Sequence, residues 1–299
     1  MIYLAEKTLK AIDEALEKDQ GASFRMWLGR VIPHMKDAFR SDEEGFRGHL
    51  GASIIGKECA REVWYSFRWT TKGRFEGRMI RLFNRGHLEE ARFIALLLMI
   101  GCQVYQQDEK GNQFRIADAN GHFGGSGDGI CINIPDLPPE TAALCEFKTS
   151  NSKGFAQLVA NGVREAKFEH YVQMNIYMRK MELPAALYLV VNKDNDEIYG
   201  ELVAVDIELA DQFISRADAI IKARTPPPRI SASPGWYNCK FCAHHKVCHM
   251  KGMPDRNCRT CKYSEPGDNG IWHCKLKNVP LSKDAQFRGC DLYEVIKEM

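Results

Sequence analysis

Three ionisable side chains in the middle of the sequence are of the types that act on phosphate esters. Asp128 lies between two glycines, and Glu146 and Lys148 flank Phe147. Successive side chains on a strand point to opposite faces, so Glu146 and Lys148 would share one face, about 6.5 Å apart, while Phe147 enters the core. Two carboxylates can hold Mg²⁺ or Mn²⁺, which lowers the pKa of a bound water. Lys148 would then steady that water or the charge that develops on the phosphate.

The order of these residues resembles the PD-(D/E)XK nuclease superfamily, in which an aspartate is followed, after a hairpin-length gap, by Glu-x-Lys. Here the Glu-x-Lys also follows the apolar run 142–145, as expected for a buried strand. A surface hairpin with a salt-bridged Glu146 and Lys148 is the alternative interpretation of this stretch alone. The resemblance implies that Asp128, Glu146 and the Phe147 carbonyl hold the divalent cation.

A long helix is predicted over 77–101, because apolar residues recur at helical spacing and Gly101 provides a stop. His87 and Glu90 share the face of this helix that should meet the sheet. In RecB-like nucleases, which the segment 85–90 resembles, such a histidine or glutamate adds a ligand to the active-site metal. We expect this role for His87 before Glu90; a place on the solvated edge of the helix is the alternative.

A further helix is predicted at roughly 164–181, with Gln173 and Tyr177 four residues apart on one face. This spacing resembles the Gln-x-x-x-Tyr motif of RecB-type nucleases. The resemblance implies that Gln173 reaches the catalytic site and that Tyr177 supports it.

Eleven cysteines are present, and seven of them fall in the last part of the chain. Cys239, Cys242 and Cys248 need a fourth soft ligand, and Cys59 is the candidate. The resemblance to iron–sulfur nucleases of the CRISPR-associated and AddB type implies a [4Fe-4S] cluster at these four residues. A small buried thiol is the alternative for Cys59. Zinc is the competing metal, and the histidines that could complete its site are His244, His245 and His249.

The last four cysteines follow a zinc-ribbon spacing, C-x2-C-x12-C-x15-C, and would fold a segment too small for its own core. They are Cys258, Cys261, Cys274 and Cys290. This module lies outside the nuclease resemblance. Nearer the N-terminus, Ser53 is expected to cap the helix that carries Cys59, with Arg61 and Arg68 exposed.

The remaining pattern places these residues in an α/β fold. An amphipathic helix is predicted over 1–20, two strands over 102–119 around a turn at 109–112, a hairpin over 185–206 and a helix over 207–223. We therefore expect a restriction-endonuclease-like mixed sheet flanked by helices, with Asp128 and Glu146 on neighbouring strands, and a cysteine-rich C-terminal metal-binding extension. The expected domains are a nuclease core (1–228), an iron–sulfur tail closed by Cys59 (229–252) and a zinc-ribbon-like module (253–299).

Composition limits the class of protein. The 299 residues are 44% apolar, enough for one large core, and the formal charge of +2 permits a local basic groove. Charge arrives at Glu6, so no signal peptide is expected, and the longest apolar run, 93–100, is too short to span a membrane. These features predict a soluble, cytoplasmic protein.

Together the motifs predict a metal-dependent DNA nuclease. The resemblance favours an exonuclease that acts on single-stranded or resected DNA ends in recombination, repair, CRISPR adaptation or phage genome processing, with a helicase or recombination protein as partner. A structure-specific endonuclease is the close alternative. A non-catalytic DNA-binding module with structural metal clusters and a redox-sensing regulator are the rivals from other classes.

Overall fold

The computed structural model describes residues 2–39, 46–110 and 112–299. The chain forms two compact units, each assembled from separated stretches. Unit 1 comprises the described residues of Met1–Glu43, Phe75–Ile116 and Ser126–Ala210, and unit 2 those of Glu44–Arg74, Ala117–Gly125 and Asp211–Met299. Met1 of the expected first helix and Gly111 of the expected turn lie outside the described residues. The three domain boundaries expected from the sequence stay a prediction.

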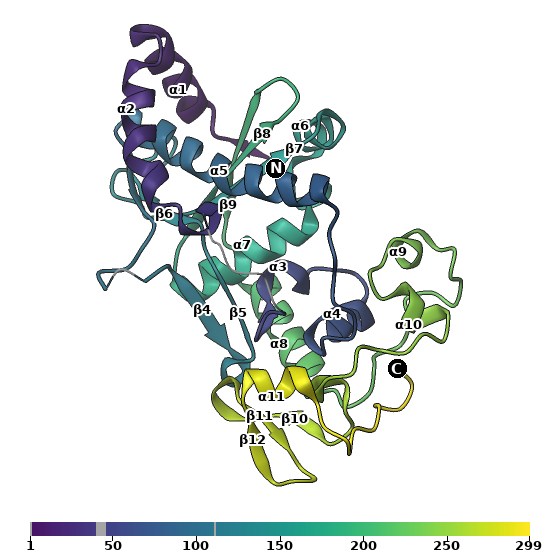
Figure 1. Ribbon diagram of the computed structural model, residues 1–299. Coiled ribbons are helices and arrows are strands. Elements are labelled where there is room, and N and C mark those ends of the chain that lie inside the picture. Colours follow the sequence, from purple (N-terminus) through teal and green to yellow (C-terminus); the bar gives the residue numbers. More distant parts are fainter. Residues whose placement is uncertain (1, 40–45, 111) are drawn as a thin grey trace. The chain divides into compact units, whose positions relative to one another are not determined.

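Unit 1 contains a six-stranded mixed sheet (Figure 1), which confirms the predicted fold class. Its order is β1 (Tyr3–Leu4), β9 (Ile198–Ala204), β8 (Ala185–Asn192), β7 (Ala143–Ser150), β6 (Gly129–Ile132) and β3 (Gln103–Tyr105). The strands β7 and β8 are parallel, and the other neighbours are antiparallel. The predicted hairpin over 185–206 is therefore confirmed as β8 and β9.

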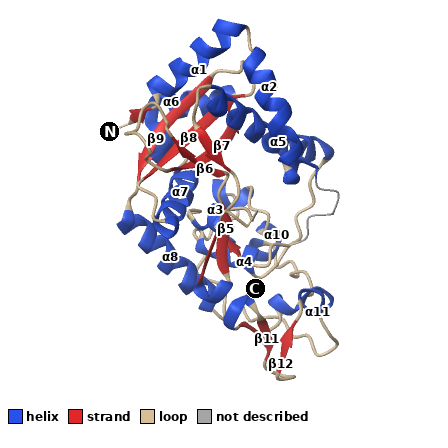
Figure 2. Cartoon of the chain, turned by 90° about the vertical axis from the view of Figure 1, so that its left-hand side faces the viewer, coloured by secondary structure: helices blue, strands red, loops and turns tan. Residues whose placement is uncertain are grey.

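Helices cover both faces of this sheet, and α5 and α7 lie on opposite sides of it (Figure 2). The helices of unit 1 are α1 (Glu6–Asp19), α2 (Ala22–Val31), α5 (Gly77–Met99), α6 (Ser152–Ala166) and α7 (Phe168–Met181), with 3₁₀ turns at Ile32–His34 and Lys36–Phe39. On one face, α1, α2 and α5 share a single apolar core with β6, β7 and β8. Phe147 enters that core as predicted and stacks on Phe93 of α5, with ring centroids 5.2 Å apart.

The predicted helix over 77–101 is confirmed, and its stop has a clear cause. Gly101 has a φ of +90°, a conformation that side-chain-bearing residues avoid, and its amide donates back to the Leu98 carbonyl. The helix predicted at 164–181 is longer in the structure and divided, because α6 ends at Ala166 and α7 starts at Phe168. The polar segment after β7 begins α6: the Asn151 side chain accepts the Gly154 amide at 2.9 Å.

Unit 2 holds the shorter elements. Those that belong to it wholly or in part are β2 (Leu50–Gly51), α3 (Ala52–Ile55), α4 (Ala60–Phe67), β4 (Arg115–Asp118), β5 (Phe123–Ser126), α8 (Ile207–Lys222), α9 (Tyr237–Lys240), α10 (His245–His249), β10 (Ser264–Pro266), β11 (Trp272–Cys274), β12 (Val279–Leu281) and α11 (Lys283–Arg288), with 3₁₀ turns at Ala119–Gly121, Cys258–Thr260 and Asp268–Gly270. The helix predicted at 207–223 is confirmed as α8.

The expected Ser53 cap is wrong. Gly51 occupies the N-cap of α3, and the Ser53 hydroxyl accepts a hydrogen bond from Arg47 at 3.3 Å instead. The predicted helix is interrupted after α3, so Cys59 becomes the N-cap of the separate helix α4.

The expected exposure of Arg61 and Arg68 is also wrong, because both are buried. The Arg61 guanidinium donates to the Pro227 carbonyl at 2.6 Å, and that of Arg68 donates to three backbone carbonyls. Burial lowers the pKa of Arg68 to about 10. Since guanidinium groups have five N–H donors, carbonyl oxygens can satisfy them inside a core without a carboxylate.

Arg259 forms a second buried cation in unit 2. Its guanidinium lies 3.8 Å from the ring centroid of Trp69 and 4.6 Å from that of Trp272, and donates to the Phe67 and Gly48 carbonyls at 3.1 and 2.8 Å. This stacking joins the segment that follows α4 to the cysteine-rich end of the chain. Among the described helices, none has the length and apolar content needed to cross a membrane.

Replacing Phe93 by alanine should lower the free energy of unfolding by about 3–5 kcal/mol, because it removes a fully buried ring and leaves a cavity against Phe147. Urea unfolding followed by far-UV circular dichroism measures this change. Tyr105→Ala, at a residue 46% exposed, is the control and should change stability far less. Equal decreases in both variants would contradict the placement of Phe93 in the core.

Candidate active site

The strand β7 brings the predicted catalytic residues together. Glu146 is completely buried near the middle of β7, and Asp128 directly precedes β6. The antiparallel register pairs Gly129 with Cys145, which places Asp128 beside Glu146. The Phe147 amide donates to Asp128 Oδ2 at 2.8 Å and so fixes this carboxylate against the strand.

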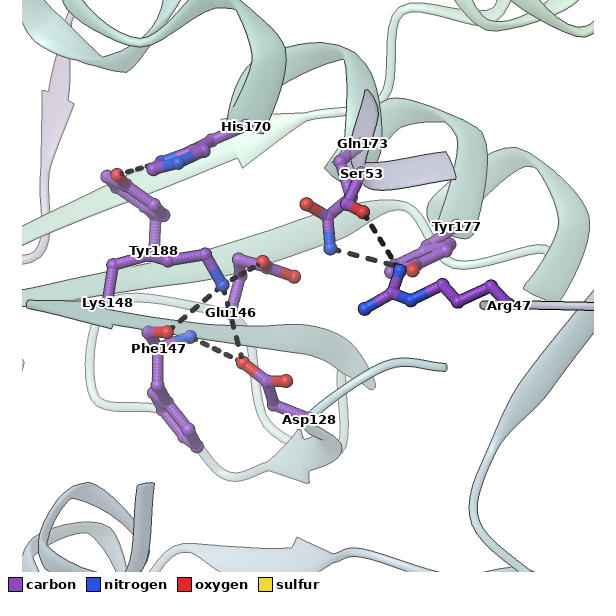
Figure 3. Close-up of polar contacts among 10 residues, drawn as sticks. All are labelled: Arg47, Ser53, Asp128, Glu146, Phe147, Lys148, His170, Gln173, Tyr177 and Tyr188. Atoms are coloured by element: carbon purple, nitrogen blue, oxygen red, sulfur yellow. Dashed lines mark hydrogen bonds and ion pairs between the residues drawn. The ribbon is translucent and has the colours of Figure 1, made fainter. Parts of the chain in front are cut away.

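Lys148 lies between the two carboxylates (Figure 3). Its ammonium forms an ion pair with Glu146, lies 3.9 Å from Asp128 Oδ2 and donates to the Phe147 carbonyl at 3.1 Å. The alternation along β7 thus places Glu146 and Lys148 on one face, as the sequence indicates. A carboxylate pair, a backbone carbonyl and an ammonium are therefore in mutual contact at one point of the sheet.

The environment of Glu146 is unfavourable for an isolated charge. Neither of its oxygens accepts a hydrogen bond from a described residue, and Oε1 has the Lys148 ammonium as its ion-pair partner. Burial raises the pKa of Glu146 to about 7; Lys148 opposes this shift and Asp128 adds to it. Burial alone would lower the pKa of Lys148, but the charges of Glu146 and Asp128 prevail and raise it. Lys148 is therefore a firmly protonated cation.

Gln173 and Tyr177 of α7 lie on this same face of the sheet. The Gln173 amide donates to the Tyr177 hydroxyl at 3.5 Å, as the four-residue spacing predicts. Burial raises the pKa of Tyr177, and the charges of Glu146 and Asp128 raise it further. The hydroxyl therefore stays protonated close to the two carboxylates.

Two more side chains belong to this site, and the sequence interpretation gave them no role. Tyr188 of β8 is in parallel register with Glu146, and its hydroxyl is 2.8 Å from His170 Nδ1 (Figure 3). Burial, followed by the charges of Lys148 and Lys167, lowers the pKa of His170 to about 3. A signal was available for each: His170 precedes Gln173 by one helical turn, and Tyr188 is the polar-tipped residue in an apolar strand.

His87 stands apart from this group. It lies in α5, and no hydrogen bond or ion pair among the described residues joins it to Asp128 or Glu146. Its Nδ1 atom is buried without a hydrogen-bond partner in the described part of the chain. Glu90 is half-buried on the same helix. Metal ligation by His87 stays a prediction.

The first group of cysteines meets in unit 2. Cys59, Cys239, Cys242 and Cys248 line one pocket, together with His245 and His249. His244 instead bonds to Ser66 at 3.1 Å. The donor set therefore fits either a four-thiolate cluster or a site completed by a histidine that lines the pocket.

The second group of cysteines is also gathered by local structure in unit 2. The backbone turns from Cys258 to Cys261, and the pairing of β10 with β11 brings Cys274 opposite Ser264. Burial raises the pKa of Cys258 to about 11, and the charges of Cys261, Cys290 and Cys274 add to this shift. Thiols in such surroundings release their protons when they bind a metal.

In the described residues, no three His, Cys, Asp or Glu side chains are arranged so that they could hold a metal ion. At the carboxylates the reason is visible, since the Lys148 ammonium serves as the counter-cation of Glu146. The orphaned oxygens of Glu146 and the orphaned nitrogen of His87 are nevertheless of the donor types that Mg²⁺ or Mn²⁺ sites use.

Comparisons with known proteins give distant similarities of fold. No family model and no curated protein matches the sequence. LHK-Exo in complex with dAMP gives a TM-score of 0.41 at 18% identity, and the alkaline exonuclease LHK-Exo from Laribacter hongkongensis gives 0.40 at 17%; each match covers 58% of this chain and 86% of the other. SSO0001 gives 0.39 at 14% identity, covering 76% and 97%. These similarities assign no role to any residue of this chain.

Replacing His170 by glutamine should reduce the acid sensitivity of the fold. A histidine whose pKa is lowered from 6.5 to about 3 contributes stability that is present above pH 6.5 and is lost as the pH falls below it. Between pH 7 and pH 5 the wild type should lose about 2 kcal/mol more unfolding free energy than His170→Gln, which can keep a hydrogen bond to Tyr188. Urea titrations at the two pH values measure this difference. The same pH dependence in both proteins would show that His170 titrates normally.

Proposed function

We propose that this protein is a metal-dependent DNA nuclease, with its catalytic residues on β7 and at the start of β6. The observation that carries the proposal is the completely buried carboxylate of Glu146, whose oxygens lack hydrogen bonds from described residues, next to Asp128 and Lys148. Burying a carboxylate in this way is costly unless the site serves to bind a cation or a reacting group.

Asp128, Glu146, the Phe147 carbonyl and His87 are the proposed ligands of Mg²⁺ or Mn²⁺. Such an ion supplies a Lewis acid for the phosphoryl oxygen and lowers the pKa of water. The Phe147 amide keeps Asp128 in position through its 2.8 Å hydrogen bond. Once Glu146 is neutralised by another cation, the Lys148 ammonium can turn to the attacking water and to the charge that develops on the phosphate.

The helix α7 provides the proposed contact with the substrate. Gln173 can place the scissile strand, and Tyr177 holds the Gln173 amide through their hydrogen bond. We propose an exonuclease that removes nucleotides from single-stranded or resected ends in recombination, repair, CRISPR adaptation or phage genome processing, assisted by a helicase or recombination protein. A structure-specific endonuclease would use the same groups.

The cysteines complete the proposal as structural sites. Cys59, Cys239, Cys242 and Cys248 would hold a [4Fe-4S] cluster, which would fasten the start of α4 to the segment of unit 2 around α9 and α10. The second group of cysteines would hold Zn²⁺; its members are Cys258, Cys261, Cys274 and Cys290.

Asp128→Asn and Lys148→Ala should each lower the rate of DNA cleavage roughly a hundredfold or more, because each removes a charge that stabilises the transition state. End-labelled single- and double-stranded DNA, with and without Mn²⁺, measures this loss, and circular single strands separate endonuclease from exonuclease action. Asp196→Asn, at an exposed residue, is the matched control and should keep full activity. Identical products from wild type and variants would refute the catalytic assignment and favour a non-catalytic DNA-binding module.

Anaerobically prepared protein should contain about four iron atoms and about one zinc atom per chain. Cys59→Ser should lose the iron and the visible absorbance but keep the zinc, whereas Cys274→Ser should lose the zinc. Cys102→Ser, in the core of unit 1, is the control and should keep both metals. A colourless wild-type protein with about two zinc atoms would instead support zinc at both groups of cysteines.

A further inference from the structure

The first half of α5 lies outside the core of unit 1. Buried residues of this helix begin at Glu89 and continue to Leu97, whereas none occurs among the described residues of Gly77–Leu88. A helix of this length is ordinarily stabilised by the apolar face that it buries. The exposed half therefore needs another role (α5 in Figure 1).

The apolar side of this exposed half continues the side that faces the core. Ile80 and Phe83 lie in line with Ala91 and Ile94, which are buried, yet they are 57% and 42% exposed. Phe75, just before the helix, is 56% exposed and packs edge-on against Phe83 with ring centroids 4.9 Å apart. Two aromatic rings and an isoleucine thus form an apolar patch at the surface.

Arginines flank this patch. Arg78, Arg81 and Arg85 are three and four residues apart, so they follow one side of the helix, and all three are exposed. In the described part of the chain, Arg78 and Arg81 form no ion pair with a carboxylate. Arg92, farther along the same side, is neutralised by Glu89 at 3.5 Å. The uncompensated positive charge is therefore confined to the exposed half of α5.

A continuous set of hydrogen bonds connects this row of arginines with the candidate active site. The Arg85 guanidinium donates to the Lys193 carbonyl at 2.9 Å, and the Lys193 amide donates to the Ser150 carbonyl at 2.9 Å. Ser150 is the last residue of β7, two residues after Lys148. All of these residues belong to unit 1.

The nearby start of α6 does not offer a comparable site for an anion. Asp194 accepts hydrogen bonds from both the amide and the hydroxyl of Ser152, and Asn151 accepts the Gly154 amide. These donors are already used and face a negative charge. The arginines of α5 are accordingly the better partners for phosphate groups.

We propose that the α5 face, defined by Phe75, Arg78, Ile80, Arg81 and Phe83, binds single-stranded DNA and leads it past Arg85 to the end of β7. Arginines beside exposed aromatic rings suit a single strand, because phosphates contact the guanidinium groups while unpaired bases stack on the rings. A duplex hides the faces of its bases and gains the electrostatic interactions only. This inference rests on the proposed function and specifies its substrate.

Fluorescence anisotropy of labelled oligo(dT), without added Mg²⁺ or Mn²⁺, tests the proposal on the full-length protein. Arg78→Glu/Arg81→Glu should weaken binding roughly tenfold or more and lower the salt dependence by about 0.7 for each phosphate that the variant no longer binds. Phe83→Ala should weaken binding roughly five- to a hundredfold with little change in the salt dependence. The double variant Lys10→Glu/Lys18→Glu on α1 makes the same change in charge at exposed residues and should bind like wild type.

Unchanged affinity and salt dependence in both α5 variants, with thermal unfolding like that of wild type, would refute the assignment. So would light scattering that shows a wild-type dimer dissociated by Phe83→Ala while DNA binding is kept, since a second copy of the chain would then cover the face. Lys148→Ala separates this inference from the proposed function, because it should abolish cleavage and retain binding. Binding through the α5 face without any cleavage by wild type would refute the nuclease and keep the surface.

Discussion

A carboxylate sealed inside unit 1 governs the arrangement of the rest. Glu146 has no exposed surface, and a charge in such surroundings is stable only beside opposite charge or strong hydrogen-bond donors. The Lys148 ammonium meets part of this requirement, and Asp128 adds a second negative charge to the same point. The strand that carries Glu146 lies within a six-stranded sheet, paired on both sides, so the costly group cannot withdraw to solvent. The fold itself holds the site in a state that favours binding of a cation.

One strand serves both the core and the site because its side chains alternate. Phe147 stacks on Phe93 on one face of β7, and Glu146 and Lys148 point to the other face, which α6 and α7 cover. Rigid packing beneath Phe147 therefore fixes the backbone amide that holds Asp128. The helix α5 is divided along its length instead: its second half stabilises the core, and its first half keeps apolar and basic side chains at the surface. Both divisions follow from the different periods of strand and helix.

Unit 2 solves a different problem, since it is rich in short elements and has buried cations. Arg68 and Arg259 rest on tryptophan rings and on backbone carbonyls, an arrangement that needs no buried carboxylate. The helix α4 has Cys59 at its N-cap and is followed directly by Arg68, which donates to the carbonyls of Arg259 and Ser264. One short helix thus contacts both groups of cysteines, and the structure of each group is coupled to the other through it.

The sequence by itself determined the strand with its two faces, the hairpin after it, the long helix with its stop at Gly101 and the spacing that brings Gln173 to Tyr177. Each of these depends on local periodicity or on a single backbone conformation, which a few neighbouring residues specify. Only the tertiary structure decided that Arg68 is buried, that Tyr188 and His170 join the carboxylates, that α6 begins directly after β7 and that the first half of α5 stays exposed. A periodic pattern states which side chains share a face, but what covers that face is set by segments distant in the chain, whose packing no local pattern encodes.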